Sequence, residues 1–157
     1  SGIEKAKEQL KMLFFNPGEK IPGIPLIGNK LDLYDDNAHE LYTYRLDYVD
    51  YHGKLAYVFE IKPKEDLGFF AKDRVVVDQM ITWFNPNTLE VLGRNYALSY
   101  KAGIYDFNVQ MEVEMTYTSN GLLVPKILRY KGDWDVVFKK RERGLFTATL
   151  FDFKVGE

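Results

Sequence analysis

The feature that most constrains the fold of this sequence is a run, from Tyr105 to Thr118, in which apolar and polar side chains alternate without exception. Successive side chains of a β-strand point to opposite faces of its sheet, so the run predicts one strand with a dry face and a wet face. The strand is longer than usual, and we expect it to twist and curve. The dry face carries the odd-numbered residues Tyr105, Phe107, Val109, Met111, Val113, Met115 and Tyr117.

The sequence on both sides of this strand also favours β-structure. Apolar side chains recur at every second position from residue 41 onward, and turn-forming residues such as Asn85-Pro86-Asn87 separate the segments. Gly132-Asp133 and Gly144 are interpreted as further turns. The pattern predicts an antiparallel meander of about seven or eight strands over residues 41–155. The expected strands are 41–50, 55–62, 74–84, 88–100, 105–118, 122–131, 134–143 and 145–154.

The N-terminal part of the chain differs from the rest. Residues 3–15 have the 3.6-residue period of an amphipathic helix, which Asn16-Pro17-Gly18 ends. Residues 16–40 are rich in proline and glycine and predict an irregular loop. We expect a single domain over residues 1–157 of the mainly β (α+β) class. Its sheet is expected to be strongly curved or an unclosed half-barrel, with the helix and loop covering the concave face.

Composition excludes several classes of protein. The formal net charge of -2 gives no overall basic field, so we predict no nucleic-acid partner. The apolar runs are far shorter than the ~20 residues of a membrane-spanning helix, so no spanning segment is expected. Without cysteine, the chain has no disulfides or thiolate metal sites. It begins Ser1-Gly2, which is typical of a cleaved tag or a processed terminus.

Motifs for catalysis and cofactors are weak. The segment 23–31 resembles a phosphate-binding loop but lacks the Lys-Ser/Thr step after its second glycine. His39 lies among possible oxygen ligands whose spacing does not match a calcium loop. Neither Ser99 nor Ser119 lies in a nucleophile elbow. We therefore predict no catalytic residue, no metal site and no cofactor, and do not expect an enzyme.

Three groups of polar residues have a simpler structural interpretation. Glu112 and Glu114 share one face of the long strand and are expected to be solvated, and His52 is expected in a solvated turn. The basic cluster at residues 139–143 lies near Trp134, a combination that can hold single-stranded nucleic acid or anionic lipid headgroups. Acidic residues interrupt that cluster, and lysine is also common at protected strand edges.

The segment Ile81 to Leu92, with its Asn-Pro-Asn-Thr turn, resembles a recurring hairpin of the periplasmic lipoprotein-carrier (outer-membrane lipoprotein-sorting) superfamily. The segment from Asn120 to Lys126 is similar to the Gly and apolar-Pro turn of that superfamily. The resemblance covers roughly residues 41–155. It implies a curved, unclosed antiparallel barrel that holds acyl chains, lipoproteins or peptide partners, a periplasmic or outer-membrane-associated location, and no catalytic residues.

Two functions are compatible with these observations. The first is a non-enzymatic carrier or binding domain of the cell envelope that holds a lipid, an acyl chain or another hydrophobic ligand. Its expected binding residues are the odd-numbered ones from Tyr105 to Tyr117, which form ordinary core if the helix and loop fill the hollow completely. The alternative is a structural or protein-interaction module, one domain of a larger envelope protein, with no small-molecule ligand.

Overall fold

The computed structural model describes Leu33 and the residues 36–103, 105–138 and 140–154. The helix expected over residues 3–15 and the phosphate-loop-like segment 23–31 lie outside the described residues. Residues 16–40 are described only at Leu33 and from residue 36 onward. Within that short part, residues 38–40 belong to a helix, where the sequence predicts an irregular loop.

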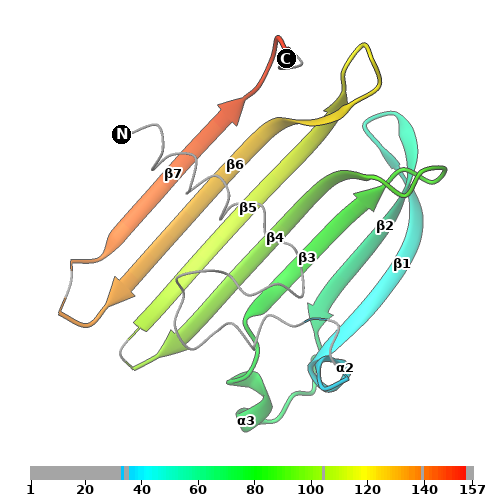
Figure 1. The fold of residues 1–157 in the computed structure, drawn as a ribbon. Coiled ribbons are helices and arrows are strands. Elements are labelled where there is room, and N and C mark those ends of the chain that lie inside the picture. The colour runs from blue at the N-terminus through cyan, green and yellow to red at the C-terminus, as the bar shows by residue number, and fades with distance from the viewer. Residues whose placement is uncertain (1–32, 34–35, 104, 139, 155–157) are drawn as a thin grey trace. The chain divides into compact units, whose positions relative to one another are not determined.

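The architecture is a seven-stranded antiparallel sheet in which each strand pairs with the next along the chain (Figure 1). The two ends of the sheet do not meet, so the predicted unclosed, mainly β meander is confirmed. Two helices of a single turn complete the described structure. The elements are α2 (Ala38–Leu41), β1 (Tyr42–Tyr51), β2 (Lys54–Pro63), α3 (Phe69–Lys72), β3 (Val77–Phe84), β4 (Val91–Ala102), β5 (Tyr105–Tyr117), β6 (Leu123–Val136) and β7 (Glu142–Thr149).

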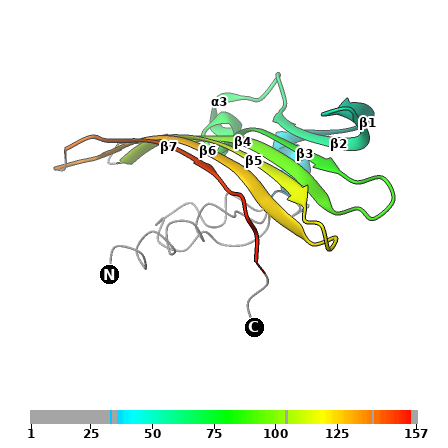
Figure 2. The same ribbon diagram turned by 90° about the horizontal axis from the view of Figure 1, so that it is seen from above.

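The contacts divide the chain into two compact units. One unit contains the described residues up to Thr43 together with Pro63–Val76, and the other contains Tyr44–Lys62 and Val77 onward. In the smaller unit, the Lys64 amide donates to the Leu41 carbonyl at 2.9 Å and the Val76 amide to the Tyr42 hydroxyl at 3.3 Å. In the larger unit, β3 to β7 lie side by side in one layer (Figure 2).

Most of the predicted strands are confirmed. The first hairpin turns at His52-Gly53, and the second turns at the Asn85-Pro86-Asn87 segment. The long strand of perfect alternation is β5, and it ends one residue earlier than predicted, at Tyr117. Helix α3 lies in the connection before β3 and had no strong signal in the sequence.

The predictions of turns at Gly132-Asp133 and at Gly144, and of a separate strand over 134–143, are wrong, because Gly132 lies within β6 and Gly144 within β7. Strand β6 continues through Gly132 and Asp133 to Val136, and the chain turns only before Glu142, where β7 begins. Gly132 pairs with Val109 on one side and with Gly144 on the other, so it lies in the middle of the sheet.

Packing explains why a glycine is required there. The rings of Tyr130 and Trp134 stack at 5.8 Å between centroids and 23° between planes. A Cβ atom at Gly132 would lie 2.2 Å from the Tyr130 hydroxyl and 2.4 Å from the Trp134 ring. Glycine in a strand often marks such a close approach rather than a turn.

Most of the buried side chains of the larger unit lie on one face of the sheet, which we call the odd face because it carries the odd-numbered residues of β5. Registers place Met80 beside Tyr96, Tyr96 beside Met111 and Met111 beside Tyr130. The opposite face, the even face, carries Glu112, Glu114 and their neighbours. The buried residues on the odd face are Ile61, Val77, Met80, Thr82, Tyr96, Leu98, Phe107, Met111, Val113 and Leu128.

We expect Gly132→Ala to destabilise the protein by about 1–3 kcal/mol, because the new methyl group displaces the stacked rings of Tyr130 and Trp134. Gly144→Ala is the matched control, since a Cβ atom there meets its nearest neighbour at an ordinary 3.5 Å. Urea denaturation of the two variants and the unchanged protein measures the difference. Equal stability of the three proteins contradicts this account of β6.

Candidate functional site

The candidate site is the odd face, where three neighbouring strands bring apolar side chains together. In β5, Phe107, Met111 and Val113 are buried, and Val109 and Met115 are half-buried. Their side chains point to one face because β5 keeps a regular alternation along this stretch. The antiparallel pairing with β4 and β6 then sets which side chains lie beside them.

Two hydrogen bonds join polar side chains on this face. The Tyr96 hydroxyl donates to the Met111 sulfur at 2.9 Å, and the Arg94 Nε donates to the buried Thr82 hydroxyl at 3.0 Å. Burial is the main reason why the pKa of Tyr96 is raised. The phenol of Tyr96 therefore stays neutral, and the centre of the face has the low polarity that suits an apolar ligand or an ordinary core.

Aromatic side chains from neighbouring strands extend this surface. Tyr100 of β4 pairs with Phe107, and their ring centroids lie 6.3 Å apart. Tyr130 and Trp134 of β6 lie beside Met111 and Phe107, respectively, and stack over Gly132. All of Tyr100, Tyr130 and Trp134 are half-buried. These residues form an aromatic margin around the buried apolar centre.

Sequence reasoning did not assign these neighbours to the site. Alternation marks Leu128, Tyr130 and Trp134 as sharing a face only if β6 continues through Gly132. The predicted turn there separated Trp134 from Tyr130. Recognising the glycine as a position of close approach would have restored the pattern.

The predicted site residues fall into three groups. Phe107, Val109, Met111, Val113 and Met115 lie together on the odd face, as their alternation predicts. The side chain of Tyr105 lies outside the described residues.

Tyr117 forms the third group, because it is exposed and takes part in a polar network. Its hydroxyl donates to Glu90 at 2.8 Å and accepts from Asn85 at 3.1 Å. Hydrogen bonds from Thr88 and then Tyr117 lower the pKa of Glu90. Tyr117 thus ties the β3–β4 turn to the end of β5, which is a structural role.

On the even face the structure brings together residues that the sequence keeps apart. His52, at the tip of the first hairpin, places Nε2 3.8 Å from Glu114 Oε2, and the Lys126 ammonium lies 3.4 Å from Glu114 Oε1. Glu112 pairs with Arg129 at 3.1 Å. His52 is exposed, as predicted for a turn. Both glutamates are paired with cations rather than only solvated, Glu114 with Lys126 and Glu112 with Arg129.

Tyr51 holds the hairpin tip against this face. Its ring stacks on Trp83 with centroids 4.7 Å apart, and its hydroxyl lies over Gly93, where a Cβ atom would be only 2.1 Å away. Burial, and then the charges of Glu114 and Glu112, raise the pKa of Tyr51 to about 12. The Tyr51 phenol therefore stays protonated at neutral pH and is not present there as a phenolate nucleophile.

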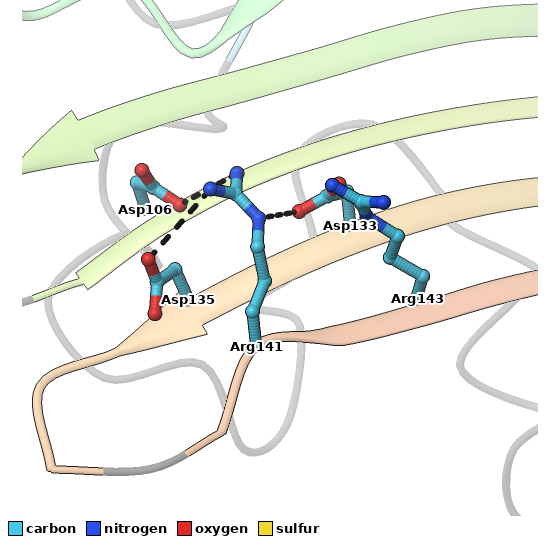
Figure 3. A network of polar contacts seen from close by, with 5 residues as sticks. All are labelled: Asp106, Asp133, Asp135, Arg141 and Arg143. Atoms are coloured by element: carbon cyan, nitrogen blue, oxygen red, sulfur yellow. Dashed lines mark hydrogen bonds and ion pairs between the residues drawn. The ribbon is translucent and has the colours of Figure 1, made fainter.

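A second charged group lies at the other end of β5 and β6 (Figure 3). Asp106 pairs directly with Asp135 across the strands, and Asp133 lies near them. Arg141 lies 3.6 Å from Asp106 and 3.7 Å from Asp135, and donates from Nε to Asp133. Arg143 also donates to Asp133, at 2.9 Å. Like charges directly opposite each other repel, so Arg141 is needed to neutralise this end of the sheet.

The remaining candidates from the sequence are Ser99 and His39. Ser99 donates to Asp78 at 2.8 Å on the sheet surface, and His39 lies in α2. In the described part of the chain, no three His, Asp or Glu side chains are grouped so that they could hold a metal ion. No described helix is long and apolar enough to cross a membrane.

Comparison with known proteins found no matching family model, curated protein or solved structure. The proposals below therefore rest on the residues and geometry of this chain.

We expect Tyr51→Phe to reduce the loss of stability at alkaline pH. The raised pKa of Tyr51 stabilises the folded state fully below the ordinary tyrosine pKa of about 10, and this contribution is lost as the pH rises through about 12. Thermal unfolding between these pH values measures it, with the exposed Tyr57→Phe as control. If both variants lose stability as the unchanged protein does, Tyr51 has no special environment.

We expect the stability difference between the unchanged protein and Arg141→Gln to be largest near neutral pH. The hydrogen bond from Arg141 lowers the pKa of Asp133, so its stabilisation is present above the ordinary aspartate pKa of about 4 and is lost as the pH falls below it. Thermal unfolding across acidic pH measures the difference. A constant difference throughout means that Arg141 acts by packing alone.

Proposed function

We propose that this chain is a non-enzymatic binding domain that holds a lipid acyl chain or a similar hydrophobic ligand against the odd face. The observation that carries the proposal is the alignment of buried Phe107 and Met111 with the half-buried ring pair Tyr130–Trp134 on adjacent strands. Methionine suits such a site because its flexible thioether adapts to irregular apolar partners. Aromatic rings provide large apolar contact areas with few rotatable bonds.

The shape and location of the site are further parts of this proposal. A sheet that curves around the ligand, with an N-terminal helix as cover, encloses an acyl chain more fully than a flat one. A periplasmic or outer-membrane-associated location and the lipoprotein-carrier relationship rest only on the two resembling turns. The polar clusters support a non-catalytic function, because Glu112, Glu114 and Asp133 are each paired with a lysine or an arginine.

A second candidate function, an interaction module of a larger envelope protein, is favoured by β7. This strand is the last of the sheet, and its Leu145 is 84% exposed and Phe146 is 42% exposed. An edge strand with exposed apolar side chains can pair with another chain. In this case the odd face is ordinary core and holds no ligand.

Ligand binding is tested by native mass spectrometry of the purified chain and by displacement of a bound fluorescent dye with palmitate. We expect Trp134→Ser to weaken palmitate binding by roughly tenfold, because a large apolar contact is lost from the margin of the site. Met111→Asp is expected to abolish binding, since it places a charge at the apolar centre.

Leu145→Ser is the matched control, because it removes an apolar side chain from the even face. Circular dichroism verifies that each variant is folded. Absence of both bound lipid and dye displacement in the unchanged protein, or equal weakening by Leu145→Ser and Trp134→Ser, overturns the proposal and leaves the interaction module.

A further inference from the structure

The turn between β6 and β7 presents an apolar tip. Val137 is 42% exposed, and Phe138, beside it, is completely exposed. Phe138 also has a φ angle of 69°, in the left-handed region that residues with a Cβ atom rarely adopt. An exposed aromatic side chain on a backbone of this kind makes the tip a candidate contact site.

Basic residues accompany this tip. Lys140 is exposed, and Lys139 adds a second positive charge to the same segment of the sequence. Lys101, also exposed, lies at the end of β4, which the antiparallel order places at the same end of the strands as the β6–β7 turn. Arg141 and Arg143 pair with the nearby aspartates (Figure 3). These arginines hold the turn to the sheet, and the exposed Lys140 precedes Arg141 in the chain.

The opposite end of the same strands provides a comparison (Figure 1). Leu89, in the β3–β4 turn, is 64% exposed and has a φ angle of 60°, so it resembles Phe138 in both respects. Its neighbour is Glu90, and neither that turn (residues 85–90) nor the β5–β6 turn (residues 118–122) contains a lysine or an arginine. Apolar tips occur at both ends of the sheet. Of the β3–β4, β5–β6 and β6–β7 turns, the β6–β7 turn alone combines such a tip with lysine in its sequence, while the opposite end has Lys54 beside the β1–β2 turn.

We propose that the β6–β7 turn docks on an anionic lipid surface. The Phe138 side chain enters the interface between headgroups and acyl chains, and Lys140 lies at the level of the lipid phosphates. An exposed apolar side chain beside lysines matches this layered environment, because apolar area is buried while the charges meet anionic headgroups. Single-stranded nucleic acid suits the turn less well, because its binding needs a row of stacking rings and unpaired arginines. Arg141 and Arg143 are paired with Asp133. The proposed docking does not depend on whether the odd face holds a ligand.

The test measures binding of the full chain to vesicles of phosphatidylcholine alone and of phosphatidylcholine with an equal amount of phosphatidylglycerol. We expect binding to the anionic vesicles only, decreasing as salt is added. Phe138→Ser is expected to weaken it by roughly tenfold and Lys140→Gln by roughly fivefold. Leu89→Ser, which removes the matched tip at the opposite end, is expected to bind as the unchanged protein does.

A second variant reports insertion directly. In Phe138→Trp the new indole is expected to show blue-shifted emission and quenching by brominated lipids when anionic vesicles are added, relative to the unchanged protein with Trp83 and Trp134. Absence of vesicle binding, equal loss in Leu89→Ser and Phe138→Ser, or complete displacement from the vesicles by a single-stranded oligonucleotide overturns the proposal.

Discussion

The antiparallel register between β4, β5 and β6 is the constraint on which the other features of the larger unit depend. It places Tyr96, Met111 and Tyr130 in one row across three strands. A slip of one residue would move Met111 to the even face and bring Gln110 or Glu112 into the apolar centre. Burying an unpaired carboxylate costs far more than a single sheet hydrogen bond contributes, so the alternation of β5 fixes the register.

Glycines let aromatic rings lie close to this sheet on both faces. Gly132 leaves room for the Tyr130–Trp134 pair on the odd face, and Gly93 leaves room for the Tyr51 hydroxyl on the even face. In each case the space freed by one absent methyl group is filled by a ring that stacks on another ring. Removing the glycine therefore disturbs a pair of aromatic side chains and not only the strand itself.

The charges of the sheet are arranged by position along the strands. Carboxylates that lie close together, such as Asp106 and Asp135, are neutralised by Arg141 from the following turn. The arginines are thereby paired with carboxylates of the sheet, and the proposed docking depends on Lys140 as the cation of the turn. The arginines thus contribute to the stability of the β6–β7 connection, and Lys140 contributes to the charge of its tip.

The sequence by itself determined the class of fold. Alternation predicted β5 to within a residue, and the turn-forming residues at 51–54 and 85–87 located both early hairpins, because local side-chain periodicity and backbone preference act over only a few residues. It also identified Phe107, Met111 and Val113 as neighbours on one face. Local signals failed at Gly132. Glycine is typical of turns, but here it lies within a continuous strand and leaves room for the rings of Tyr130 and Trp134.

Only the tertiary structure decided which distant residues meet. The approach of His52 to Glu114, the stacking of Tyr51 on Trp83 and the approach of Arg141 to Asp106 join residues from separate hairpins. Such contacts depend on strand register and on the direction in which each turn folds back. Both are set by the free energy of the whole sheet, and neither leaves a periodic signal in the sequence.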